Sequence, residues 1–391
     1  MHDVRANPVD GDACPLGLTH RAYVENCRQR GLLGTEAASA RYRRFFREGP
    51  AGFPALNLKA ARVSSTPSRE GAVVKFLLRV PGRLPSDQNS WDISPQHEVQ
   101  AGAIETESVV IPMRRRHEIS NTLCVSSQIG CAMGCAFCET AQMGLVRSLT
   151  PAEIVAQWYA ARHLVGHAIR NIVFMGMGEP LDNLDGVLDA IEVLTDHHGP
   201  GIGMRSISVS TVGRIDGLLR LRERVVLPGW RQLNLAVSIN APNDEIRSAI
   251  MPVNRSMPLS ELIPILASWP KRKSAAICAE YVLIPEVNDQ PAHAAELCTL
   301  MRPVRCCVNV IPYNPRRESP WRAPTDEEVW AFIRELERHG QFCKRRGTKG
   351  RDVMAACGQL GNEEIRNRRF VGVRSADGAA LSTSGGLAAL T

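Results

Sequence analysis

The chain has 391 residues, a hydrophobic content of 44% and a formal net charge of +7, which together suit one large domain with a smaller one. It contains no run of about 18 apolar residues and no apolar signal core near Met1, so we expect no membrane association and a cytoplasmic location. Twelve cysteines without a secretory signal indicate a reducing compartment, where thiols serve metals and catalysis. The positive charge is compatible with an RNA partner but is not specific for one.

Residues 1–106 predict a small N-terminal α+β accessory region. Residues 1–14 are polar and rich in turn formers, and residues 19–49 carry a helical pattern that includes four arginines, Arg41, Arg43, Arg44 and Arg47. These arginines indicate either the solvated face of an amphipathic helix or an RNA-contacting surface. Short alternating stretches at 73–80 and 108–111 predict antiparallel strands, and residues 85–94 predict a loop.

From residue 121 the pattern alternates between strands and helices. Strands are expected at 122–126, 171–177, 206–211, 233–239, 276–284 and 306–312. Helices are expected at 184–195, 259–268, 292–301, 327–345 and, opened by a capping box at Thr150 with proline at the first helical position, at 150–165.

This alternation predicts the α/β class with a parallel sheet. The segment is short for a complete eight-fold barrel, so we expect a partial (β/α)6 barrel over residues 107–362. Its chemistry should gather in the loops after the strands. The remaining tail, residues 363–391, is first basic and then rich in Ser, Ala and Gly, and is expected to be disordered.

Directly after the first core strand stands the motif Cys131-Ala132-Met133-Gly134-Cys135-Ala136-Phe137-Cys138. A [4Fe–4S] cluster takes one ligand per iron and prefers thiolates, so three thiolates from one loop leave one iron open to a small chelating molecule such as S-adenosylmethionine. The alternative is a zinc site, but zinc usually takes two separated Cys/His pairs, and no second pair with clean spacing follows. Cys131, Cys135 and Cys138 are therefore the predicted metal ligands.

The next strand runs into Met175-Gly176-Met177-Gly178-Glu179-Pro180. Glycines here permit close approach of the backbone to a ligand, and Glu179 could accept a hydrogen bond from the ammonium group of S-adenosylmethionine. The alternative is a tight βα turn without a ligand.

Together with further segments in the same order, these motifs resemble the RlmN/Cfr family of radical S-adenosylmethionine RNA adenosine methyltransferases. The resemblance covers residues 107–360, and its segments are 122–128, 131–138, 175–180, 209–211, 235–244, 311–315 and 355–360, the last reading Ala-Ala-Cys-Gly-Gln-Leu. It implies a radical SAM barrel that methylates an adenosine ring carbon, C2 or C8, in RNA. The implied partners are 23S rRNA, with tRNA as a second substrate, and an electron donor such as flavodoxin or ferredoxin; the protein is expected to be a monomer.

The resemblance also implies roles for single residues. Cys357 matches the cysteine that is methylated and hands its methyl carbon to RNA, and Cys124 matches the cysteine that resolves the protein–RNA adduct by forming a disulfide with Cys357. Glu107 matches a proton acceptor, with Glu105 as the second candidate. Positions that hold S-adenosylmethionine match Gly178, Glu179, Ser210, Ser238, Ile239, Asn240 and Asn314.

The implied chemistry explains the two extra cysteines. Adenine carbons 2 and 8 are electron-poor, so one S-adenosylmethionine first methylates Cys357 and a second, cleaved at the cluster, starts a radical addition that a thiolate must finally resolve. Two positions depart from the family pattern: Asn240 replaces a common histidine, and Glu139 follows Cys138 where a small residue is common. The rival functions are a radical enzyme acting on tRNA sulfur chemistry or a small molecule, and a non-enzymatic metal-containing RNA-binding protein.

Overall fold

The computed structural model describes residues 14–49, 60–81, 103–115, 118–270 and 275–361. The expectations for residues 1–13, for the loop at 85–94 and for the tail 363–391 lie outside these ranges. No helix in the described part of the chain is long and apolar enough to cross a membrane.

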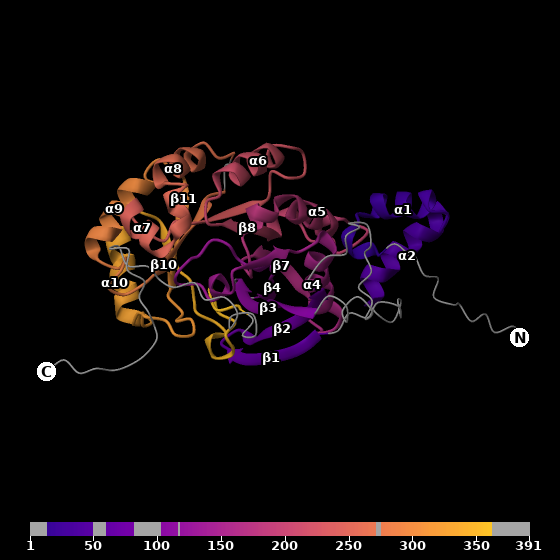
Figure 1. Ribbon diagram of the computed structural model, residues 1–391, viewed down its shortest axis with the longest axis horizontal. Coiled ribbons are helices and arrows are strands. Elements are labelled where there is room, and N and C mark those ends of the chain that lie inside the picture. The colour runs from indigo at the N-terminus through magenta and orange to yellow at the C-terminus, as the bar shows by residue number, and fades with distance from the viewer. Residues whose placement is uncertain (1–13, 50–59, 82–102, 116–117, 271–274, 362–391) are drawn as a thin grey trace, which may run out of the picture.

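The N-terminal helical pattern folds as two helices, α1 (His20–Gln29) and α2 (Thr35–Glu48), with the short helix η1 (Pro15–Gly17) before them. The chain turns between them at Gly31, whose φ of 65° suits glycine. Both helices bury aromatic residues, and Phe45 of α2 stacks on Tyr159 of α4 (Pro151–His163) with ring centroids 4.7 Å apart. The helical pair therefore packs against the core at one end of the molecule (Figure 1).

One ten-stranded sheet runs through the molecule in the order β1-β2-β3-β4-β7-β8-β9-β10-β11-β12. Its first strands pair antiparallel: β1 (Ala60–Ser68), β2 (Gly71–Pro81), β3 (Ala103–Arg115) and β4 (Glu118–Cys124). From β4 onward all pairings are parallel, through β7 (Ile169–Phe174), β8 (Ile207–Thr211), β9 (Asn234–Ser238), β10 (Ile277–Leu283), β11 (Cys306–Pro312) and β12 (Cys343–Arg345). Strand β3 spans position 107, so the accessory strands continue directly into the core sheet.

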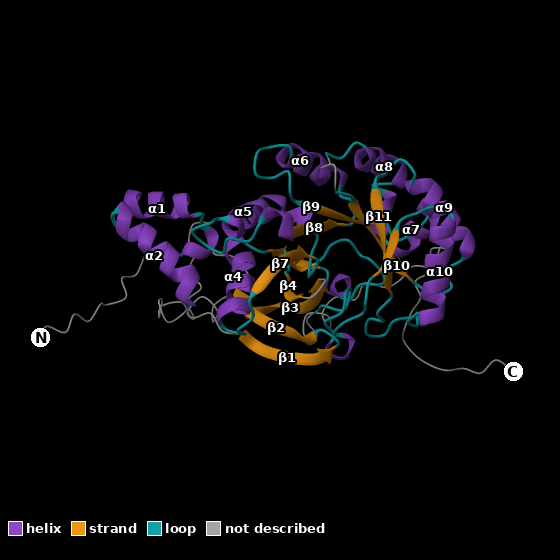
Figure 2. Cartoon of the chain, turned by 180° about the vertical axis from the view of Figure 1, so that it is seen from behind, coloured by secondary structure: helices purple, strands orange, loops and turns teal. Residues whose placement is uncertain are grey.

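Helices cover the outer face of the curved parallel part, as Figures 1 and 2 show. After α4 they are α5 (Leu184–Thr195), α6 (Ile215–Val225), α7 (Asp244–Ile250), α8 (Leu259–Ala267), α9 (Pro291–Met301) and α10 (Asp326–Arg338). Among the described strands the order begins at β1 and ends at β12, so the barrel is open. The prediction of a partial (β/α)6 barrel with a small α+β accessory region is confirmed.

The predicted helix at 327–345 is wrong at its end. Helix α10 stops at Arg338, and the chain reverses at Gly340, whose φ is 78°. Residues Cys343–Arg345 then pair with β11 as the short edge strand β12, because backbone hydrogen bonds to an open sheet edge, such as that from the Arg346 amide to the Val310 carbonyl, replace a further helical turn. The sequence analysis also missed β1, α6 and α7.

Candidate active site

The predicted cluster loop lies between the small antiparallel strands β5 (Gln128–Gly130) and β6 (Leu145–Ser148), with the short helix η3 (Thr140–Met143) between them. Gly130 has a φ of 75°, and a Cβ placed there would lie 1.8 Å from the carbonyl oxygen of Gly144. The Cys131 amide donates to that same oxygen at 3.0 Å. Only glycine lets the two sides of the loop approach this closely.

The three predicted ligands, Cys131, Cys135 and Cys138, line a cavity at the carboxyl ends of the parallel strands, which we call the carboxyl-side cavity. Its empty volume is about 1020 Å³, open solvent at its mouth included. Burial raises the pKa of all three thiols, and the neighbouring Cys131 and Cys138 raise the pKa of Cys135 further. Thiols held neutral in this way become thiolates when a metal binds.

This donor set fits a [4Fe–4S] cluster bound through one loop. A site for a single ion such as zinc needs its ligands gathered around one point, and in the described residues no group of three or more His, Cys, Asp or Glu side chains is arranged in that way. Thiolates that share one zinc crowd around it at about 2.3 Å, whereas each thiolate of a cube binds a different iron. A fourth cysteine of the same lining, Cys357, comes from a distant segment of the chain.

The turn after β7 shapes the next wall of this cavity. Gly178 has a φ of 95°, and a Cβ there would lie 2.5 Å from Cβ of Gln128. The Glu179 carboxylate accepts from the amides of Leu181 at 3.0 Å and Val212 at 2.9 Å. Burial raises the pKa of Glu179 from 4.5 to about 7, although both amide bonds lower it. Each carboxylate oxygen can accept a further donor, so a bound ammonium group finds an acceptor here.

The ends of β8 and β9 supply Ser210, Ser238 and Asn240 to the same cavity lining. Ile239, also predicted to contact the cofactor, is not among the lining side chains; it is buried at 1% exposure, and its carbonyl accepts from Arg247. Asn240 has a φ of 59°, a left-handed conformation that asparagine tolerates well. The Asn240 amide oxygen accepts from the amide of Val282 at 2.9 Å.

Arg247 of α7, which the sequence analysis did not single out, joins these strand ends through hydrogen bonds. Its guanidinium is buried at 1% exposure and donates to the carbonyl oxygens of Val212, Ser238 and Ile239. Burial lowers the pKa of Arg247 to about 10. The side chain thus holds the loops after β8 and β9 in one arrangement.

Cys357 reaches the site on a segment that runs over the cavity after the short helix η7 (Arg351–Val353). The amide group of Asn314 donates to the Cys357 carbonyl at 3.4 Å, and its oxygen accepts from Arg351 at 3.1 Å. Gly358 and Met354 have φ values of 81° and 50°. The segment is therefore tightly turned, and Asn314 ties it to the end of β11.

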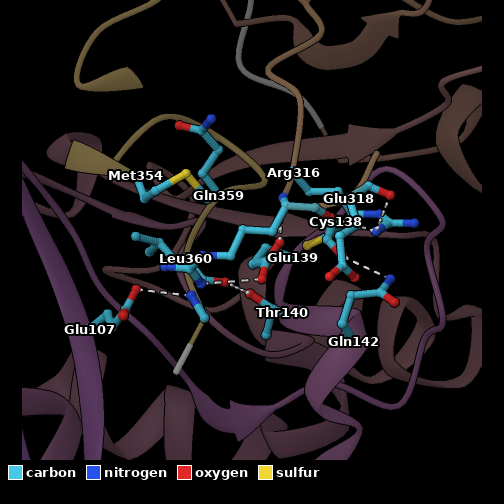
Figure 3. Close-up of polar contacts among 12 residues, drawn as sticks. Glu107, Cys138, Glu139, Thr140, Gln142, Arg316, Glu318, Met354, Gln359 and Leu360 are labelled. Atoms are coloured by element: carbon cyan, nitrogen blue, oxygen red, sulfur yellow. Dashed lines mark hydrogen bonds and ion pairs between the residues drawn. The ribbon is translucent and has the colours of Figure 1, made fainter. Parts of the chain in front are cut away.

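Two neighbouring residues, Glu139 and Thr140, fasten the same segment to the cluster loop. The Glu139 backbone amide donates to the Gly358 carbonyl at 2.7 Å, and the Thr140 hydroxyl donates to the Leu360 carbonyl, as Figure 3 shows. The Glu139 carboxylate is buried at 1% exposure and accepts from the amide and the guanidinium of Arg317, at 3.0 and 3.3 Å. The departure from the family pattern at this position is thus a buried ion pair beside the cluster loop.

Glu107 lies on β3 on the other side of this segment. One carboxylate oxygen accepts from the Gly361 amide at 2.9 Å and pairs with Lys75 at 2.8 Å, and Lys75 also donates to the Met354 carbonyl. Glu105, the second candidate, is more exposed and lies 4.0 Å from Arg79. Neither glutamate is among the residues that line the cavities described here.

Cys124 and Cys357 lie close enough to interact, although 232 positions separate them in the sequence. Burial, the larger cause, and Cys357 raise the pKa of Cys124 to about 12, although Arg346 lowers it. Both are free thiols, as are the other ten cysteines.

A second cavity opens at the amino ends of the parallel strands, and we call it the amino-side cavity. Its empty volume is about 2040 Å³, open solvent included. Of the described residues that line it, none is Asp or Glu and six are cationic, namely Arg114, Arg205, Lys344, Arg345, Arg346 and Lys349. Five residues line both cavities and form what we call the neck: Met175, Ile311, Asn314, Arg346 and Cys357.

A partial barrel with three loop cysteines at its carboxyl end defines a radical SAM enzyme, and the model of the radical SAM superfamily matches residues 125–298. A probable dual-specificity RNA methyltransferase RlmN 1 from Protochlamydia amoebophila is 45% identical over 267 residues, 68% of this chain and 72% of that protein. The dual-specificity RNA methyltransferase RlmN from Alkalilimnicola ehrlichii is 42% identical over 276 residues, 68% of this chain and 73% of that protein.

The crystal structure of a radical SAM methyltransferase from Sphaerobacter thermophilus matches with a TM-score of 0.74 and 32% identity, over 88% of this chain and 98% of that one. The chain belongs to the RlmN family of radical SAM RNA methyltransferases. Membership implies a [4Fe–4S] cluster and S-adenosylmethionine as cofactors.

Proposed function

We propose that this enzyme methylates a ring carbon of adenosine, C2 or C8, in 23S rRNA and also in tRNA, through a methylated Cys357. The observation that carries the proposal is the place of Cys357 at the neck. On one side lies the cavity of the three loop cysteines, and on the other a cavity with six cationic residues. The dual specificity in the names of the relatives supports two RNA substrates.

Cys131, Cys135 and Cys138 would hold the cluster, and Gly178, Glu179, Ser210, Ser238, Asn240 and Asn314 would hold S-adenosylmethionine, with Ile239 acting through its backbone. When bound, the cluster supplies the electron that cleaves S-adenosylmethionine and so starts radical chemistry on an unreactive carbon. A small electron-transfer protein such as flavodoxin or ferredoxin would provide that electron. Glu179 would accept a hydrogen bond from the ammonium group of S-adenosylmethionine, and the segment of Cys357 would cover the site.

Cys357 would accept a methyl group as a thiolate and carry its carbon to adenine. Cys124 would then act as the second nucleophile, since its thiol interacts with that of Cys357. Burial, and to a lesser extent Cys357, raises the pKa of Cys124, which keeps its thiol protonated at rest. After deprotonation, the Cys124 sulfur would attack the Cys357 sulfur and form a Cys124–Cys357 disulfide, while the S–C bond to the RNA breaks and the carbon leaves with the electron pair and takes up a proton.

Glu107 is the proposed proton acceptor, with Glu105 as the second candidate. What supports Glu107 is its contact with the Cys357 segment through Gly361 and its pairing with Lys75. A base held there touches, from β3, the short segment that carries Cys357.

The amino-side cavity would admit the RNA. Cationic side chains attract phosphates, and six of them line this cavity, although Arg345, Arg346 and Lys349 are paired with carboxylates outside the lining. Asn171 and Asn234 line the same cavity at the strand starts, where a base would meet them. An adenosine taken out of its stack can then reach Cys357 at the neck.

The proposal is tested by mass spectrometry of adenosines from 23S rRNA and tRNA of cells with and without the gene. A methyladenosine that disappears with the gene, and returns with the wild-type gene but not with Cys357→Ala, is expected. Unchanged adenosines together with altered thionucleosides in tRNA would instead favour the rival sulfur chemistry.

A further inference from the structure

We propose that Arg346 activates Cys357 as the methyl acceptor, by holding its sulfur as a thiolate at the neck between the two cavities. This assignment rests on the proposed methylcysteine function and adds a residue to it. Arg346 follows the edge strand β12, the strand that the sequence analysis took for a helix end.

The geometry of the neck places a single charge beside the thiol. Of the five described residues that line both cavities, Arg346 alone is charged and Cys357 alone carries a nucleophile. The Arg346 backbone amide is fixed to the Val310 carbonyl at 2.8 Å. Its side chain lines both cavities and is 24% exposed.

A buried carboxylate orients the guanidinium. Glu280 of β10 is 6% exposed and accepts from Nη1 of Arg346 at 3.0 Å, while the Ser210 hydroxyl donates to its other oxygen at 2.8 Å. The same Nη1 lies 3.5 Å from the sulfur of Met175. These bonds engage one end of the guanidinium, and an arginine has five donors.

Other titratable groups face the same place from neighbouring strands. Cys278 and Glu280 come from β10, Cys124 from β4, and Arg351 from the Cys357 segment itself. The Cys357 thiolate is the largest of the influences that raise the pKa of Arg346, ahead of Glu280. The attraction between opposite charges is mutual.

The chemical need for this charge lies in the first methyl transfer. The Cys357 sulfur attacks the methyl carbon of S-adenosylmethionine, an S–C bond forms, the sulfonium–methyl bond breaks, and S-adenosylhomocysteine leaves with the electron pair. Only the thiolate is nucleophilic enough, so the thiol proton must first pass to water. After methylation the sulfur is neutral, and Arg346 is left beside Cys124, the thiol that must act next.

The test is the pH profile of Cys357 alkylation by iodoacetamide, followed by peptide mass spectrometry on cluster-loaded protein whose intact mass shows no methyl group. Arg346→Gln should raise the midpoint by about one pH unit, which slows alkylation at pH 7.5 up to about tenfold. Arg346→Lys should recover part of the shift. Glu280→Gln should move the midpoint the opposite way, because the cation loses its counter-charge.

The matched control is Arg345→Gln, which removes the same charge one position earlier. Arg345 lines the amino-side cavity but not the neck, and it pairs with Asp326 and lies over the ring of Trp330, so its loss should leave the midpoint unchanged. Equal shifts in both variants, or no shift in Arg346→Gln, would overturn the assignment. If Arg346→Gln fails to keep the cluster, Glu280→Gln decides: a lowered midpoint supports the proposal and an unchanged one overturns it.

This readout needs no RNA. A shifted midpoint in a protein that methylates no adenosine would refute the proposed function and leave the role of Arg346 at Cys357 standing. Adenosine methylation with an unshifted midpoint would support the proposed function and overturn the role of Arg346.

Discussion

At the scale of single residues, Cys124 and Cys357 have different surroundings. Cys357 faces both cavities at the neck, whereas Cys124 is 7% exposed and lines neither. A methyl carrier must reach both cofactor and substrate, and a resolving thiol needs to reach only the carrier. The geometry therefore supports unequal roles for the two.

Loss of Cys124 should trap RNA on Cys357, because no thiolate remains to displace it. Purified Cys124→Ala protein is expected to carry an RNase-sensitive mass on the peptide of Cys357, and the Cys124→Ala/Cys357→Ala double variant none. RNA found on Cys124 in the Cys357→Ala variant would reverse the two roles, and RNA on neither would refute the methylcysteine mechanism.

The Glu139–Arg317 pair is buried unequally, since the side chains are 1% and 31% exposed. Arg317→Gln removes this cation from beside a buried carboxylate and should cost up to about 3 kcal/mol of unfolding free energy. Glu139→Gln leaves the positive charge on the side chain that is 31% exposed and should cost less, and the double variant should recover part of the Arg317→Gln loss. Denaturant unfolding of the three variants measures this; equal losses in both single variants would contradict a pair controlled by burial.

Glu179 makes stability depend on pH in the absence of S-adenosylmethionine. Its pKa is about 7 in the folded protein against 4.5 ordinarily, so the folded state holds the proton more tightly. The stabilisation is fully present below pH 4.5 and is lost as the pH rises through 7, by up to about 3 kcal/mol. Melting temperatures between pH 5 and 8 should therefore fall more steeply in wild type than in Glu179→Gln. The exposed Glu118→Gln control should follow wild type.

At the scale of elements, turns at the strand ends position the site. The turn after β7 passes so close to β5 that Gly178 and Gln128 leave no room for a Cβ. The loops after β8 and β9 are joined by Arg247, and the cluster loop is joined to the Cys357 segment by Glu139 and Thr140. The active site is therefore assembled from separate loops that are cross-linked by hydrogen bonds.

Gly178→Ala tests the closest of these contacts. The new methyl group would meet Gln128 at 2.5 Å in a left-handed backbone, so stability and S-adenosylmethionine binding should both fall. Gly166 has a similar φ of 84° but open space around it. Gly166→Ala should lower the free energy of unfolding only by the strain of a left-handed backbone, about 1 kcal/mol, and leave S-adenosylmethionine binding unchanged. Calorimetry and thermal melting compare the two, and equal effects would show that crowding is unimportant.

At the scale of the whole molecule, two basic surfaces are candidates for RNA binding. One is the amino-side cavity, and the other is the exposed face of α2 with Arg43 and Arg44. Arg43 donates to Ser39 and Arg44 pairs with Glu48. In the cavity, Arg345, Arg346 and Lys349 also form ion pairs, whereas Arg205 and Lys344 form none with the described residues. The cavity is therefore the stronger candidate for phosphate contact, and α2 behaves as a solvated helix face.

The salt dependence of RNA binding separates these surfaces. Arg205→Gln/Lys344→Gln in the cavity should flatten the log–log slope by roughly 0.7 to 0.9 per lost contact. Arg43→Gln/Arg44→Gln on α2 should leave the slope unchanged. Fluorescence anisotropy with a labelled RNA fragment over a salt series gives both slopes. A flatter slope only in the α2 variant would move the RNA site to the N-terminal helices.

The sequence alone determined the fold class, most strand and helix positions, the cluster loop and the family. These features depend on local patterns, because strand periodicity, the capping box at Thr150 and the spacing from Cys131 to Cys138 each lie within one element or one loop. The match of 306–312 with β11 and of 184–195 with α5 follows from such local patterns.

Only the tertiary structure decided what lies across the barrel. Sequence gave no signal that Arg346 shares the neck with Cys357, that Glu280 bridges Ser210 to Arg346, or that Arg317 neutralises Glu139. The partners of Glu280 and Glu139 in these contacts lie 66 to 178 positions away in the chain. No local periodicity encodes such contacts, because they depend on how separate strand ends and loops converge when the sheet curves. For the same reason β12 looked helical: an open sheet edge, present only in the folded barrel, paired with those residues.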